Sequence, residues 1–301
     1  MKRFLVFFLF MLFIPVLALS QTRIKAENVM NQINEGQPVN YENVEIVGDI
    51  DFTSLKDITP DEDSDNTYLC NVRSPVSFIN CVFSGNVIGY LTDSNDFLEL
   101  FNINNDLYNV VFHEDAVFSG CEFKRESLFK YAQFLKHADF NNTKFHEEAY
   151  FKYAEFSTEI SFLKAEFNDD ANFKYTDFPE AVHFNDALFH GDAIFKYAKF
   201  PKGVTFENAV FEKTADFKYT DFPEIVKYNG AKFQGEAIFK YAEFPKGVTF
   251  ENAVFERMAD FKYSKFSGDV NLNNTDFKGD IDIKYAEVNG MSFTKYMLIK
   301  K

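Results

Sequence analysis

Apolar residues recur along most of the chain at alternating intervals of six and five residues. Between Phe112 and Val288 this register has 33 positions, and 29 of them are Phe. The residue two positions earlier is small or β-branched, as at Ala138 and Val204. Residues i and i−2 of an extended chain face the same side, whereas a helix needs apolar spacings of three and four. The pattern therefore predicts short β-strands that place one large and one small residue in a common interior.

A second period of 22 residues lies within the first. An apolar residue followed by Lys-Tyr recurs eight times between Phe129 and Ile283, and four prolines from Pro179 to Pro245 are also 22 residues apart. A solenoid turn of 22 residues would stack like side chains on like. We therefore expect eight four-sided coils over residues 112–288, a rod about 40 Å long, and stacked Phe rings along its axis. The prolines are expected at corners where no ladder hydrogen bond is needed.

The repeated units resemble those of a known family. They are Ala138-Asp139-Phe140, Ala215-Asp216-Phe217, Ala259-Asp260-Phe261 and their relatives. These units are similar to the A(D/N)(L/F)xx unit of pentapeptide-repeat proteins. The resemblance implies an all-β fold, a right-handed quadrilateral parallel β-helix, over residues 112–288. Every second unit here has six residues, as in a Phe-rich branch of that family.

The two ends of the chain depart from the register. Residues 1–20 have a basic start at Lys2 and Arg3, an apolar run and a small-residue cleavage site, so we predict a secretory signal peptide removed before Gln21. An uncleaved membrane anchor is the alternative, although the apolar run is short for a span. Residues 21–42 are expected to form an N-terminal cap with a short helix at residues 24–35. Residues 289–301 are expected to form the opposite cap, since Phe293 falls out of register.

Two insertions interrupt the irregular first coils, which cover residues 43–111. The first, residues 53–68, is an acidic loop, and the second covers residues 84–109. Within the second, the segments VIGYLTD and DLYNVVF could pair as a hairpin. Recognition often concentrates in loops on a rigid scaffold. The insertions are therefore the predicted partner surface.

The Lys-Tyr pairs are predicted to point outward and to form a ladder along the rod. Acidic residues four positions before several ladder lysines, such as Glu148 before Lys152, could offset the stacked charges. Stabilisation of the rod is the simpler interpretation, but stacked tyrosines could also bind a glycan or a flat protein surface. The candidate binding residues on the insertions and the ladder are Asp61, Glu62, Asp63, Tyr68, Tyr90, Tyr153, Tyr175, Tyr197, Tyr219 and Tyr241.

The formal net charge is −15 at pH 7. Without Lys2 and Arg3 the chain would have 29 basic and 46 acidic residues, which gives −17. Such acidity argues against a nucleic-acid partner, because phosphate backbones favour basic patches. It permits a basic partner, although solubility of an exported rod is the simpler explanation.

The sequence offers no catalytic, cofactor-binding or metal-binding constellation. The five histidines lack HExxH spacing, the acidic residues lack EF-hand spacing, and no G-x-S-x-G, Walker or Rossmann motif occurs. Oxidising conditions outside the cytoplasm would allow a Cys70–Cys81 disulfide. Buried free thiols are favoured instead, because these two residues should lie on opposite sides of a coil.

These observations favour a non-catalytic exported rod, periplasmic or secreted in a bacterium, that acts as a scaffold or binds an unknown protein or glycan. No transmembrane span is expected in the mature chain, and a homodimer through the C-terminal end is conceivable. The family resemblance also implies an alternative, a DNA mimic that inhibits a topoisomerase, which would require the protein to remain in the cytoplasm. A polysaccharide-active enzyme would need a non-repeating acidic cleft, whereas the acidic residues here recur coil by coil.

Overall fold

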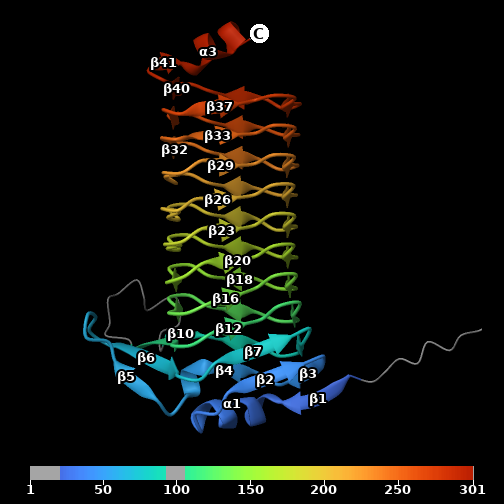
Figure 1. The fold of residues 1–301 in the computed structure, drawn as a ribbon, viewed down its shortest axis with the longest axis vertical. Coiled ribbons are helices and arrows are strands. Elements are labelled where there is room, and N and C mark those ends of the chain that lie inside the picture. The colour runs from blue at the N-terminus through green and yellow to red at the C-terminus, as the bar shows by residue number, and fades with distance from the viewer. Residues whose placement is uncertain (1–20, 93–105, 301) are drawn as a thin grey trace, which may run out of the picture.

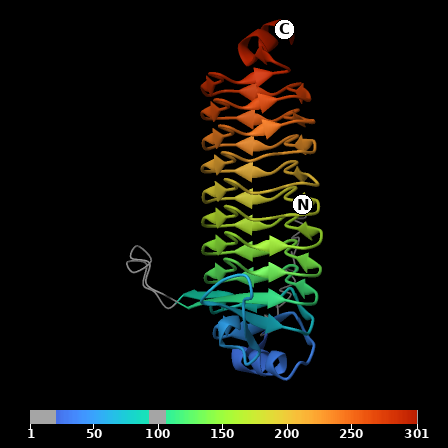
Figure 2. The same cartoon turned by 90° about the vertical axis from the view of Figure 1, so that its left-hand side faces the viewer.

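The computed structural model describes residues 21–92 and 106–300. The predicted signal peptide, residues 1–20, lies outside the described residues. The chain forms a parallel β-solenoid of about 12 coils with a spacing of about 22 residues, and the coils stack along one long axis (Figures 1 and 2). The predicted four-sided solenoid and its 22-residue coil are therefore confirmed.

The strands lie on four faces of the rod, here called A to D. They pair in parallel register apart from three antiparallel pairs within face D. Within a regular coil the chain passes through faces D, B, A and C in that order. Face A contains β1 (Thr22–Lys25), β3 (Val44–Val47), β8 (Val82–Phe83), β13 (Glu122–Phe123), β17 (Lys144–Phe145), β21 (Glu166–Phe167), β24 (Leu188–Phe189), β27 (Val210–Phe211), β30 (Lys232–Phe233), β34 (Val254–Phe255) and β38 (Asp276–Phe277).

Faces B and C each contain ten strands. Face B contains β2 (Val39–Glu42), β7 (Val76–Ile79), β12 (Ala116–Val117), β16 (Ala138–Asp139), β20 (Ile160–Ser161), β23 (Val182–His183), β26 (Val204–Thr205), β29 (Val226–Lys227), β33 (Gly247–Thr249) and β37 (Asp269–Asn271). Face C contains β4 (Ile50–Asp51), β9 (Val87–Ile88), β14 (Ser127–Leu128), β18 (Ala149–Tyr150), β22 (Ala171–Asn172), β25 (Ala193–Ile194), β28 (Ala215–Asp216), β31 (Ala237–Ile238), β35 (Ala259–Asp260) and β39 (Ile281–Asp282).

Face D is divided into a six-stranded and a four-stranded sheet. The six-stranded sheet contains β5 (Ile58–Pro60), β6 (Thr67–Val72), β10 (Tyr90–Thr92), β11 (Leu107–Phe112), β15 (Gln133–Phe134) and β19 (Glu155–Phe156). The four-stranded sheet contains β32 (Glu243–Phe244), β36 (Lys265–Phe266), β40 (Glu287–Val288) and β41 (Met291–Ser292). Between these sheets face D is reduced to isolated bridges from Glu155 to Glu243.

The division of face D comes from its prolines, and here the expectation about their position is wrong. Each proline follows the register Phe of face D. In other coils that position donates a ladder hydrogen bond, as Ser157 does to the carbonyl of Phe134 at 2.9 Å. Pro179 and its equivalents have no N–H to donate. The prolines therefore remove a bond that neighbouring coils make, rather than occupying a position that needs none.

The core consists of aromatic rings stacked from coil to coil. Rings on the same face lie nearly parallel, as for Phe145 and Phe167 with centroids 5.0 Å apart at 3°. Rings on different faces meet edge to face, as for Phe151 and Phe162 at 5.5 Å and 81°. Both arrangements are the favoured geometries for aromatic pairs. The register positions therefore fill the axis of the rod, as predicted.

The alternating intervals of five and six residues correspond to two kinds of corner. The five-residue intervals cross the B–A and C–D corners, where one residue adopts a left-handed backbone, such as Asn142 (φ 54°) or Tyr153 (φ 60°). The next residue closes the turn, as when the N–H of Ala154 donates to the carbonyl of Phe151 at 2.9 Å. The six-residue intervals cross the D–B and A–C corners, which take one more residue.

Helices cover both ends of the solenoid (Figure 1). The predicted N-terminal helix is present as α1 (Ala26–Asn34), which buries Val29 and Ile33 against the first coils. At the other end, α3 (Phe293–Lys300) places the Phe293 ring 5.3 Å from that of Phe266. Capping in this way covers the apolar end of a coil, which would otherwise be exposed. Among the described residues, no helix is long and apolar enough to cross a membrane.

The three cysteines are buried free thiols. Cys70 lies on face D, where its thiol donates to the carbonyl of Thr53 at 3.8 Å, and burial raises its pKa to about 11. Cys81 immediately precedes β8 on face A. The two residues therefore lie on different faces, and the alternative of a Cys70–Cys81 disulfide is not realised.

Candidate functional site

The C–D corner carries the Lys–Tyr ladder, which consists of Lys130–Tyr131 and its equivalents every 22 residues up to Lys284–Tyr285. All eight tyrosines adopt the left-handed backbone conformation, with φ between 56° and 62°. The B–A corner has the same backbone, but there the position is filled by Gly, Lys, Asp and most often Asn, as at Asn142 and Asn208. A left-handed backbone is unfavourable for most side chains and least so for Gly, Asn and Asp. The fold therefore does not require tyrosine at this corner.

The tyrosine rings stack on one another along the corner. Tyr175 and Tyr197 have centroids 4.7 Å apart at 1°, and Tyr197 and Tyr219 are 4.9 Å apart at 2°. Desolvation, followed by the neighbours Tyr175 and Tyr219, raises the pKa of the Tyr197 hydroxyl. Both faces of each interior ring are covered by its neighbours. The ladder therefore presents ring edges and hydroxyl groups, and stacking of a sugar on a ring face is prevented along its interior.

The ladder lysines lie over the tyrosine rings. The ammonium of Lys174 is 5.2 Å from the ring centroid of Tyr175, and Lys240 lies 5.3 Å from that of Tyr241. These distances fit cation–π attraction. The acidic residues four positions upstream, such as Glu148, lie across face C at the A–C corner. An ion pair that does form here, Lys262–Asp282 at 2.7 Å, joins consecutive coils.

Both insertions leave the solenoid at this same corner, and the second begins later than predicted, because residues 84–89 continue the coil through β9. In the register of face C, Ile50 and Val87 align with Ser127, and on face D Val72 and Phe112 align with Phe134. Residues 53–69 and 90–109 therefore stand where a regular coil has only the two residues Lys-Tyr. Within them β5 pairs with β6 and β10 pairs with β11, and these four strands form a flange that projects from the base of the rod (Figure 1).

The predicted hairpin in the second insertion is confirmed by the antiparallel pairing of β10 with β11. The β5–β6 hairpin was not predicted, since its sequence was read as an acidic loop. Asp61, Glu62 and Asp63 lie in the turn of that hairpin, at the outer end of the flange. The rest of the second insertion, residues 93–105, lies outside the described residues.

The flange is continuous with the ladder. Tyr68 on β6 stacks on Tyr108 of β11 at 5.2 Å. Tyr90 on β10 lies 5.8 Å from the ring of Tyr131, and the ammonium of Lys130 donates to its hydroxyl at 2.9 Å. Tyr90 therefore extends the ladder by one ring. The structure thus places the predicted tyrosines along one corner and its flange, whereas the predicted acidic residues join them only at the tip.

A groove that sequence reasoning missed runs beside the ladder on face D. Its lining includes Tyr197 and Tyr219 of the ladder together with Pro201 and Pro223, and its volume is about 370 Å³. Its remaining lining is Asp177, Ala198, Lys199, Phe200 and Asp221. The signal in the sequence was the shared 22-residue period of tyrosine and proline, which are four residues apart in the four coils that contain both.

Two carboxylates in this groove differ in their surroundings. Asp177 forms an ion pair with Lys199 at 3.0 Å. Desolvation, followed by the charge of Glu243, raises the pKa of Asp221. Carboxylates and phenol hydroxyls are hydrogen-bonding groups. The groove can therefore bind a polar ligand by hydrogen bonds along its length.

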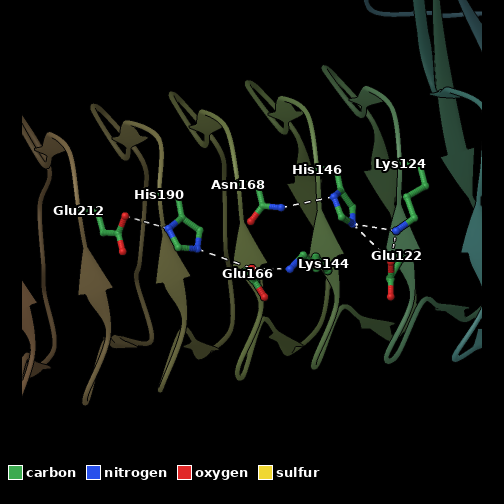
Figure 3. Close-up of polar contacts among 8 residues, drawn as sticks. All are labelled: Glu122, Lys124, Lys144, His146, Glu166, Asn168, His190 and Glu212. Carbon is green, nitrogen blue, oxygen red and sulfur yellow. Dashed lines mark hydrogen bonds and ion pairs between the residues drawn. The ribbon is translucent and has the colours of Figure 1, made fainter.

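A polar network follows the outer side of face A (Figure 3). Its members are Glu122, Lys124, Lys144, His146, Glu166, Asn168, His190 and Glu212. Most of its contacts join consecutive coils, as between Lys144 and Glu166 at 2.6 Å and between His190 and Glu212 at 2.8 Å. His146 and His190 thus lie on the outer side of the rod and bond along it. Over residues 21–92 and 106–300, no group of three His, Cys, Asp or Glu side chains is arranged to hold a metal ion.

Comparisons with known proteins found two matches to this chain. A family model described as pentapeptide repeats (9 copies) matches residues 107–155, 129–177, 151–199, 174–221, 195–243, 217–265 and 239–287. No curated protein matches the chain. A similar solved structure is the crystal structure of HetL, a pentapeptide repeat protein involved in heterocyst differentiation regulation from the cyanobacterium Nostoc sp. strain PCC 7120. The two are 12% identical over 88% of this chain and 98% of that chain, with a TM-score of 0.31.

Proposed function

Because the chain belongs to the pentapeptide-repeat family, we propose that it is a non-catalytic, exported rod that binds a protein partner through the flange and the Lys–Tyr ladder. Members of this family are generally non-catalytic. The rod would hold the flange and ladder rigidly, and the partner would contact the tyrosine edges and the acidic tip of the flange.

One observation supports this proposal most directly: both insertions and the ladder occupy the same corner of the coil. The equivalent B–A corner has the same backbone without tyrosines and without an insertion. Aromatic side chains with hydroxyl groups are enriched at protein interfaces, because one end is apolar and the other forms hydrogen bonds. The C–D corner therefore has the composition of a binding surface.

The register shows how the flange can be removed without changing the coils. Because Gly89 and Val110 align with Phe129 and Ala132, residues 90–109 can be replaced by Lys-Tyr, and residues 53–69 can be replaced likewise. The resulting chain should keep its coils and lose the partner. Chemical crosslinking in cells that export the protein, followed by mass spectrometry, measures this. Capture of the same partner by the flange-free chain would contradict the assignment.

The ladder is tested separately by replacing Tyr175, Tyr197 and Tyr219 with Asn, the residue that the B–A corner uses at this backbone conformation. We expect weaker crosslinking with unchanged folding. The matched control replaces Asn142, Asn208 and Asn252 of the B–A corner with Gly, which also tolerates this conformation. If the control loses the partner as much as the ladder variant does, the ladder has no special role.

A glycan is the second candidate ligand, and the groove on face D favours it. Tyrosine hydroxyls, the Asp221 carboxylate and proline rings line this groove. A glycan would bind by hydrogen bonds to ring edges, since the ring faces are covered. Asp221→Asn would then weaken binding on a glycan array, while Glu155→Gln, on the same face outside the groove, would not. Equal effects of the two substitutions would exclude the groove as the site.

A second copy of the chain is a further candidate partner, at the C-terminal end. β37, β38 and β39 end their sheets, and Ile281 on β39 is 38% exposed. Helix α3 packs on β40 and β41 of face D, and the open edges of the other three sheets favour pairing with another chain. We propose that two rods pair there.

A further inference from the structure

Cys81 and Cys121 occupy the same position in consecutive coils. Each immediately precedes a strand of face A, and Val82 of β8 pairs with Glu122 of β13. The N–H of Glu122 donates to the carbonyl of Cys81 at 2.8 Å, which fixes the two residues side by side. Both side chains are fully buried. They are 40 residues apart in the sequence because the second insertion lies between them.

The Cys121 thiol is directed toward the preceding coil. At this position, immediately before a face A strand, a side-chain hydroxyl donates to a backbone carbonyl of the preceding coil, as Thr143 does to the carbonyl of Phe118 at 2.8 Å. The Cys121 thiol does the same to the carbonyl of Phe78 at 3.3 Å. This orientation brings it toward the coil of Cys81, whose own thiol donates to the carbonyls of Tyr41 and Ile79, each at 3.4 Å.

The separation of the two residues suits a disulfide. Neighbouring parallel strands lie about 4.8 Å apart, and bonded cysteines have Cα atoms roughly 4.4–6.8 Å apart. The hydrogen bond from Cys121 lowers the pKa of Cys81 to about 7. Cys81 is therefore the more readily ionised thiol, and the thiolate is the nucleophile in disulfide exchange.

We propose that Cys81 and Cys121 are a disulfide-forming pair that is oxidised by a small-molecule disulfide such as oxidised glutathione. The Cys81 thiolate attacks one sulfur of the oxidant, and the released glutathione thiolate takes up a proton. Cys121 then loses its proton and attacks the Cys81 sulfur, which releases the second glutathione. Two protein thiols become one disulfide, and one oxidised glutathione becomes two reduced molecules.

The bond would fasten together the coils on either side of the second insertion. It would enclose residues 81–121 in a covalent loop and so hold the base of the flange. Because both sulfur atoms are buried, exchange requires the coils to open. Oxidation is therefore expected during folding, and slowly in the folded protein.

The test is to unfold the full chain in reductant and refold it in a mixture of reduced and oxidised glutathione. Remaining thiols are then blocked with N-ethylmaleimide in denaturant, and circular dichroism confirms refolding. Mass spectrometry should show one modified cysteine per chain, Cys70, and one peptide pair joined through Cys81 and Cys121. Three modified cysteines, or a bond that includes Cys70, would overturn the proposal.

Single variants separate this pair from other pairings. Cys70→Ala should form the bond and leave no thiol to modify, whereas Cys81→Ser and Cys121→Ser should each leave two. The proposal does not rest on export or on a partner, because the refolding experiment supplies its own oxidant. If the isolated chain does not refold, the folded protein is instead kept in oxidised glutathione for several days before the same mapping, and three free thiols would then equally overturn the proposal.

Discussion

Tyr228 stands in the ring stack of face B, between Phe206 and Phe250 of the coils before and after it. Its ring lies 5.1 Å from that of Phe206 and 5.2 Å from that of Phe250, nearly parallel to both. The residue is fully buried, and its hydroxyl has no hydrogen-bond partner. Burial raises the pKa of this hydroxyl well above its usual value. Replacing Tyr228 with Phe should therefore stabilise the protein.

The expected gain follows from two opposing effects. An unsatisfied buried hydroxyl costs about 1–3 kcal/mol. Its removal leaves a space of roughly one atom, and at about 24 cal/mol per Å³ this offsets only a few tenths of a kcal/mol. We expect the free energy of unfolding to rise by about 1–2 kcal/mol, with the reciprocal variant Phe250→Tyr destabilising by a similar amount.

Urea unfolding followed by circular dichroism measures both variants. The midpoint should move up for Tyr228→Phe and down for Phe250→Tyr with an unchanged slope, since neither alters the surface exposed on unfolding. Equal midpoints for Tyr228→Phe and the unchanged chain would refute the reasoning, because they would mean that the hydroxyl is satisfied, for example by a buried water.

Three further predictions concern charge, assembly and export. Burial raises the pKa of Glu148, and the carboxylates of Asp170 and Glu126 raise it further. The ionised form of Glu148 therefore destabilises the fold, and Glu148→Gln should raise the free energy of unfolding by on the order of 0.5 kcal/mol at pH 7. This gain should shrink as the pH falls and the Glu148 carboxyl becomes protonated, and a gain independent of pH in urea titrations would contradict it. Ile281→Lys should convert a dimer into a monomer in light scattering, whereas a wild-type chain that is already monomeric would rule out pairing through this end. N-terminal sequencing of the exported protein should begin at Gln21, and retention of residues 1–20 would contradict cleavage.

The solenoid could be predicted because each coil repeats the same chemistry at the same spacing. A period of 22 residues places every Lys-Tyr pair above the last, and the structure confirms this with tyrosine centroids 4.8 Å apart at Tyr153 and Tyr175. The register residue and the small residue two positions before it identify the side chains of each unit that face the axis. The core and the size of the coil therefore follow from the sequence alone.

The flange and the cysteine pair could not be predicted in this way, since they depend on where the chain re-enters the register. The second insertion lengthens its coil, so Cys81 and Cys121 are neighbours in space although they are not 22 residues apart in the sequence. The proline positions were misjudged for another reason. Periodicity shows that Pro179 and its equivalents stack, but not whether the N–H that they lack would have been used in the ladder.

The irregular features of the rod gather on one side of it. Faces A, B and C are unbroken sheets of 11, 10 and 10 strands, whereas face D is divided into two. The flange, the prolines and the groove all belong to face D, and the ladder lies on its border with face C. The three continuous sheets of faces A, B and C and the stacked rings can hold the coils together, while face D loses backbone hydrogen bonds. Face D is therefore the side on which variation costs the fold least, and it is there that we expect the partner to bind.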